Sequence, residues 1–135
     1  LYKKAAERAI IPQVFFQLGL AYLKKGMNNE AVDVYKKLIE IAPDYEEAHL
    51  NLGLAYGGLK RWNEAIQSFF RELSFHPENY YAYIYLGFVY KELGDYKKAI
   101  SYFKKAYSKP GVPDPEGLFK VISDLESRIE SKVGH

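Results

Sequence analysis

Three consecutive segments of this sequence align with one another at a constant period and without a gap. Residues 12–45, 46–79 and 80–113 are each 34 residues long. The columns that recur in all three are Leu18, Leu52 and Leu86; Gly19, Gly53 and Gly87; Tyr22, Tyr56 and Tyr90; Ala31, Ala65 and Ala99; and Tyr35, Phe69 and Phe103. A period of about 20–50 residues indicates a stack of similar units, each of which buries its apolar face against its neighbours.

Within each segment the apolar residues follow helical spacing twice. In the first segment the two stretches are carried by Phe15, Leu18 and Tyr22, and then by Ala31, Tyr35 and Leu38. Offsets of three and four residues are typical of one face of a helix. Each segment is therefore predicted to form a pair of helices, with Gly26 and Gly94 at the ends of first helices.

The glycine column lies inside predicted helices, where each glycine costs about 1 kcal/mol relative to alanine. A cost that recurs three times indicates a packing requirement. We expect a Cβ at Gly19, Gly53 or Gly87 to collide with the neighbouring helix. The small residues of the alanine column are expected to allow the same close approach from the partner helix.

Together these columns resemble the signature of the tetratricopeptide repeat family, over residues 12–113. The sequence departs from that signature at His49, where the family prefers a large packing residue, and at Glu72, where it prefers a small one. The third repeat has Gly111 where proline is expected. The resemblance implies an all-α fold: a right-handed superhelix of three helix-turn-helix repeats with a C-terminal capping helix.

The two ends of the chain differ from the repeats. Residues 1–11 are interpreted as a partial helix, the remnant of a preceding repeat, because Tyr2–Ala5 is similar to Tyr35–Leu38. Residues 114–135 are interpreted as a capping helix and tail. Asp114 is a good N-cap with Pro115 at the first helical position. The apolar stripe expected to face the last repeat is Leu118, Val121, Ile122, Leu125 and Ile129.

The family resemblance also implies where a partner binds. In this family the first helix of each repeat lines a concave groove. Carried over position by position, the expected groove residues are Phe16, Leu20, Leu23, Leu50, Asn51, Leu54, Tyr81, Ile84 and Phe88. Most are apolar, and the inner face of each helix is already used by the leucine, glycine and tyrosine columns. An exposed apolar patch would mark an interaction site.

The sequence therefore predicts a scaffold or adaptor that binds an apolar or amphipathic protein segment in the groove. One alternative is a homo-oligomeric scaffold that uses the same groove for self-assembly. Another is a substrate-recruiting arm of a larger enzyme. A subtype of the family grips a C-terminal carboxylate with Lys and Asn side chains. Of those requirements only Asn51 is met here, so that function is not expected.

Composition and motifs argue against several other classes of function. The formal net charge is +2, which gives no sign of a nucleic-acid partner. The chain has no cysteine, and His49, His76 and His135 lack metal-ligand spacing, so neither a metal nor a cofactor is expected. No phosphate-binding loop or catalytic triad is apparent, and the chain is predicted not to be an enzyme. No signal peptide or membrane-spanning run is seen, and the expected location is cytoplasmic.

Overall fold

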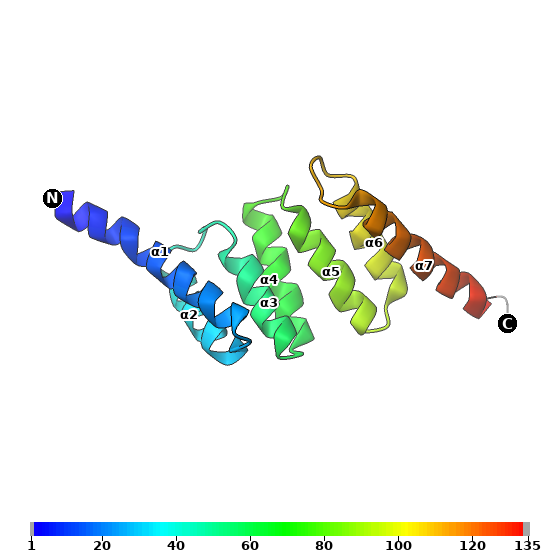
Figure 1. Ribbon diagram of the computed structural model, residues 1–135, viewed down its shortest axis with the longest axis horizontal. Helices are drawn as coiled ribbons and strands as arrows, with labels where there is room; N and C mark the ends of the chain where they lie inside the picture. Colours follow the sequence, from blue (N-terminus) through cyan, green and yellow to red (C-terminus); the bar gives the residue numbers. More distant parts are fainter. Residues whose placement is uncertain (1, 134–135) are drawn as a thin grey trace. The chain divides into compact units, whose positions relative to one another are not determined.

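The computed structural model describes the backbone of residues 2–133 and the side chains of residues 10–131, and all its regular elements are helices within that range (Figure 1). The helices are α1 (Tyr2–Lys24), α2 (Asn28–Ile41), α3 (Ala48–Gly58), α4 (Trp62–Phe75), α5 (Tyr80–Glu92), α6 (Tyr96–Tyr107) and α7 (Pro115–Val133). The expected all-α helical-repeat class is confirmed. The chain divides into two compact units, one up to Pro77 and the other from Glu78, and each is described by itself.

The first unit contains two helical hairpins, α1–α2 and α3–α4. Helix α3 packs against α4 and also against both helices of the preceding hairpin. The second unit contains the hairpin α5–α6, with α7 beside α6 (Figure 1). Helix α3 therefore contacts three other helices, whereas α1 contacts two, and this difference affects the candidate site.

Helix α1 corrects one expectation. It runs without interruption from Tyr2 to Lys24 and carries Pro12 inside it. Residues 2–11 therefore extend the first helix of the first repeat, and the separate partial helix expected over residues 1–11 is wrong. The segment before Pro12 has no glycine to stop a helix and is rich in Ala, Lys, Glu and Arg, all strong helix formers. These preferences outweigh the break that the proline suggests.

The glycine column packs as expected. A Cβ built at Gly53 would lie 2.5 Å from Cε1 of Phe69, and one at Gly19 would lie 2.6 Å from Cζ of Tyr35. Gly87 stands in the same relationship to Phe103, at 2.6 Å. All three rings are buried. The cost of glycine in each helix is thus offset by the close approach of a buried aromatic ring.

The turns inside the hairpins use left-handed backbone. Gly26 and Gly94 have φ values of 75° and 81°, where glycine has no steric cost. The equivalent residue in the middle hairpin is Lys60, with φ of 59°. Gly57 and Gly58 lie at the end of α3, inside the helix. The middle hairpin therefore turns on a residue with a Cβ.

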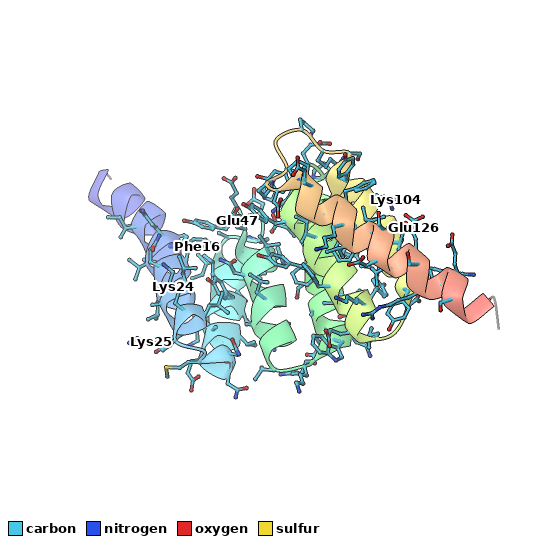
Figure 2. The ribbon with its side chains drawn as sticks, turned by 45° about the vertical axis from the view of Figure 1, so that its right-hand side comes forward. Phe16, Lys24, Lys25, Glu47, Lys104 and Glu126 are labelled. Atoms are coloured by element: carbon cyan, nitrogen blue, oxygen red, sulfur yellow. The ribbon has the colours of Figure 1, made fainter. Side chains whose placement is uncertain are left out.

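Helix α7 covers one side of α6. Leu118, Ile122 and Leu125 are buried in a cluster with residues of α6, and Val121 and Ile129 pack at its edge. Asp114 begins the helix as expected, because its Oδ1 accepts a hydrogen bond from the backbone N–H of Gly117 at 3.1 Å. At the surface Lys104 and Glu126 form an exposed ion pair at 3.9 Å (Figure 2). The apolar stripe read from the sequence is the face that meets α6.

Candidate protein-interaction site

The first unit holds six of the nine expected groove residues, on α1 and α3, which are in contact. Phe16, Leu20 and Leu23 lie at offsets of four and three residues, so they share one face of α1. All three are partly exposed, and so is Leu54 on α3. Neighbouring helices thus bring partly exposed apolar side chains to the surface of this unit.

Leu50 and Asn51 do not belong to that exposed set. They are only 4% and 7% exposed, which corrects the expectation that the apolar columns are open in every repeat. The physical reason is the position of α3, which packs against α1, α2 and α4. Asn51 is held there by a hydrogen bond from its Nδ2 to the Tyr35 hydroxyl at 3.1 Å. Burial raises the pKa of Tyr35 to about 12, so this hydroxyl stays protonated.

The second unit holds the other three expected residues on one face of α5. Tyr81 is 38% exposed and Phe88 is 43% exposed, with Ile84 partly buried between them. Tyr85 stacks on Tyr81 with ring centroids 6.3 Å apart. Phe88 meets the buried ring of Phe103 edge to face at 5.1 Å. Tyr81, Tyr85 and Phe88 therefore lie on one side of α5, each in contact with another aromatic ring and each at least partly exposed.

A cleft beside α1 was not singled out from the sequence. It has a volume of ≈ 500 Å³ and is lined by Phe16, Tyr45, Glu46 and Glu47. Figure 2 shows Phe16 and Glu47 next to each other at this place. The rings of Phe16 and Tyr45 are tilted against each other at 5.4 Å. The sequence could have indicated Glu47, because it occupies the same repeat position as Tyr81, one of the expected groove residues.

Glu47 has an unusual backbone and an unusual environment. It precedes α3 with φ of 67° and makes no side-chain capping hydrogen bond. Its pKa is raised, first because burial desolvates the carboxylate and then because the carboxylates of Glu46 and Glu72 lie nearby. The cleft therefore combines two aromatic rings with a concentration of negative charge.

Two of the three departures from the family signature, His49 and Glu72, are buried in the first unit. His49 is buried, its Nε2 donates a hydrogen bond to the Pro43 carbonyl oxygen at 3.0 Å, and its ring stacks on that of Phe75 with centroids 5.6 Å apart. Because the Pro43 oxygen can only accept, Nε2 carries the proton. Desolvation lowers the pKa of His49. Glu72 is completely buried and accepts a hydrogen bond from the backbone N–H of Leu50 at 3.2 Å. Both residues serve the fold.

The described part of the chain holds neither a membrane-spanning helix nor a group of metal ligands. Among residues 2–133 no helix is long and apolar enough to cross a membrane. Among the described side chains, those of residues 10–131, no three His, Cys, Asp or Glu residues are grouped so that they could hold a metal ion.

Helical hairpins of this kind, stacked with small residues against aromatic rings, define a helical-repeat protein. Two family models match the sequence: one described as "TPR repeat" covers residues 19–60, and one described as "Tetratricopeptide repeat" covers residues 80–109. The chain belongs to the tetratricopeptide repeat family. No curated protein matches it in sequence.

Solved structures share the fold at low sequence identity. The Sgt2 TPR domain from Aspergillus fumigatus is 20% identical with a TM-score of 0.81, over 92% of this chain and 82% of that one. The complex of the TPR2B domain of yeast Sti1 with pHsp70 is 20% identical with a TM-score of 0.78, over 91% and 98%. The chaperone SycD from Yersinia enterocolitica, in complex with a peptide of the translocator YopD, is 16% identical with a TM-score of 0.78, over 89% and 92%. At these identities the likeness establishes the fold.

Proposed function

We propose that this protein is an interaction adaptor that binds an apolar or amphipathic segment of a partner protein. The observation that carries the proposal is the partial exposure of apolar side chains along the first helices of the hairpins. In the first unit these are Phe16, Leu20, Leu23 and Leu54, and in the second they are Tyr81, Ile84 and Phe88.

Such surfaces favour a segment with its own apolar face. Burial of apolar area contributes about 25 cal/mol per Å². A ligand that covers these partly exposed side chains would therefore gain binding free energy. An amphipathic helix inserts anchors at spacings of three and four residues, which matches the offsets of Phe16, Leu20 and Leu23. The complexes of SycD with a YopD peptide and of Sti1 with pHsp70 support peptide binding as a use of this fold.

A partner recognised through a free carboxylate fits this chain poorly. Such recognition requires cationic side chains, whereas the corresponding positions hold Phe16, Leu20, Tyr81 and Tyr85. A carboxylate moved out of water without a cationic partner loses more hydration than apolar contacts return. These apolar and aromatic side chains therefore favour an apolar segment and disfavour the carboxylate of a chain end.

The proposal is tested by affinity capture from lysate of the source cells, followed by mass spectrometry. The baits are the wild type, a Leu54→Arg/Phe88→Arg variant and a Phe70→Arg control. Phe70 is an apolar residue on α4 that is 41% exposed, so its replacement places the same charge on a different helix. We expect a protein that is retained by the wild type and the control and lost by the double variant. If the folded double variant retains the same proteins as the wild type, the proposed site is wrong.

A homo-oligomeric scaffold is the second candidate, favoured by the exposure of Val14 and Leu18 on α1. Val14 and Leu18 are 56% and 41% exposed there, whereas their equivalents on α3, Ala48 and Leu52, are 0% and 7% exposed. A face that is covered in one repeat and open in another is suited to receive a helix. Sedimentation velocity over a range of concentrations tests this candidate, and a mass that rises with concentration in the wild type but not in Leu18→Arg would support it.

A further inference from the structure

The cleft beside α1 has a shape and charge that suit one kind of side chain. We refer to its four lining residues, Phe16, Tyr45, Glu46 and Glu47, as the aromatic-acidic pocket. Phe16 lies on α1, and Tyr45 lies in the connection between α2 and α3. The Phe16 ring also contacts the buried Tyr35 ring in a T-shaped arrangement, with centroids 6.1 Å apart and an interplanar angle of 71°. The aromatic wall is therefore supported by the core of the first unit.

No ion pair with a Lys or Arg side chain of the described residues reaches Glu46 or Glu47, and the group that favours the charged form of Glu47 is the imidazole of His76. The ion pairs found there join Arg61 to Glu64, Lys104 to Glu126 and Lys109 to Glu78. Desolvation and the neighbouring carboxylates raise the pKa of Glu47, which shows that the negative charge there is costly. A cation placed between these carboxylates would remove that cost.

We propose that the aromatic-acidic pocket binds a lysine or arginine side chain of the partner segment, and this inference rests on the proposed function. The methylene stem of such a side chain can lie along the rings of Phe16 and Tyr45 while the cationic end meets the carboxylates of Glu46 and Glu47. The same side chain would place its backbone beside Leu20, the next residue along this face of α1. The partner is thus an apolar segment that carries a basic residue at one fixed position.

Other side chains satisfy this pocket less well. An apolar group would fill the space between the rings and leave both carboxylates further desolvated without a partner. An acidic side chain would add a third negative charge. The pocket therefore gives specificity within the apolar surface, both for a basic residue and against acidic segments.

The experiment is a selection from a random peptide library displayed between fixed Gly-Ser flanks, so that no free amino terminus is available. The baits are the wild type and Glu46→Gln/Glu47→Gln, which keeps the size of both side chains. The control bait, Glu40→Gln/Glu92→Gln, changes the net charge equally at two exposed positions outside the pocket. Circular dichroism checks that all baits are helical.

We expect peptides selected by the wild type and by the control to share a Lys or Arg beside apolar residues, and those selected by Glu46→Gln/Glu47→Gln to lack this enrichment. Replacing that basic residue by norleucine should weaken binding to the wild type about 5- to 10-fold, and binding to the pocket variant less than about 2-fold. Peptides that depend on Leu54 but carry no common basic residue would overturn this inference and leave the proposed function standing. Peptides that bind equally well to Leu54→Arg/Phe88→Arg would overturn both.

Discussion

Glu72 of α4 completes the beginning of α3, because its Oε1 accepts a hydrogen bond from the backbone N–H of Leu50 at 3.2 Å. The first backbone N–H groups of a helix have no partner within it, and the residue before α3, Glu47, makes no side-chain cap. A carboxylate also suits the positive end of the helix dipole. The residue that departs from the family signature at this position thus joins the two helices of the second hairpin.

Replacement of Glu72 should reveal this role. We expect Glu72→Ala to lower the free energy of unfolding by about 2 kcal/mol or more, since a buried N–H loses its charged acceptor. Glu72→Gln should cost less, because an acceptor oxygen remains. Urea unfolding followed by circular dichroism measures both. Glu40→Ala, at an exposed position on α2, is the control, with an expected effect within about 0.5 kcal/mol. Equal stability of Glu72→Ala and the wild type would show that the hydrogen bond does not contribute.

Two glycines of α3 should respond to alanine in opposite directions. At Gly53 a Cβ would lie 2.5 Å from the buried Phe69 ring, and we expect Gly53→Ala to destabilise the protein by about 1–3 kcal/mol. At Gly57 the nearest atom, on Trp62, is 3.9 Å away. There the better helix propensity of alanine should stabilise by about 0.5–1 kcal/mol. Thermal unfolding of the two variants side by side tests the pair, and a stabilised Gly53→Ala would refute the packing argument.

Lys60 offers a route to greater stability. Its φ of 59° falls where the equivalent residues are Gly26 and Gly94. We expect Lys60→Gly to stabilise the protein by about 1 kcal/mol, because the left-handed region disfavours a Cβ by about that amount. Lys60→Val should be destabilised, since a β-branched side chain tolerates this conformation least. The midpoint of urea unfolding should therefore rank the three proteins as Gly, then Lys, then Val, and any other order would contradict the conformational reason.

His49 should make stability depend on pH. Burial lowers its pKa in the folded protein below the ordinary value, against a smaller opposing contribution from the hydrogen bond with Pro43. The unfolded chain therefore takes up the proton first as the pH falls. Stability from this group is complete above the unfolded pKa, near 6.5, and decreases as the pH falls toward the folded pKa.

The test is the melting temperature between pH 7.5 and 5.5, measured for the wild type and for His49→Phe. We expect the wild type to lose more stability over this range than the variant, which keeps an aromatic ring against Phe75 but cannot titrate. Parallel curves for the two proteins would mean that His49 does not couple folding to protonation.

The repeating features of this fold could be predicted from the sequence because they depend on local spacing. Gly53 recurs with Gly19 and Gly87 at a fixed period, so a close approach of the neighbouring helix could be predicted, although its specific partner, the ring of Phe69, could not. The cap at Asp114 was equally local, because its side chain accepts a hydrogen bond from the backbone N–H three residues on.

The remaining features depend on contacts between distant residues. The burial of Leu50 reflects the helices on either side of α3, and the role of Glu72 joins residues 22 positions apart. The aromatic-acidic pocket likewise needs the α2–α3 connection to bring Tyr45 to Phe16. The prediction for residues 1–11 rested on the similarity of Tyr2–Ala5 to Tyr35–Leu38, a local match that does not show where a helix ends, and α1 continues through Pro12.

The central claim is that a partner segment lies on the apolar faces of the first helices, and site-specific photocrosslinking tests it most directly. The photoreactive residue p-benzoylphenylalanine is placed at Leu54 of α3 in one protein and at Phe70 of α4 in another. Each is irradiated with the captured partner or with a selected peptide. We predict a crosslinked product from position 54 and none from position 70. A crosslink from position 70 alone would contradict the proposed binding surface.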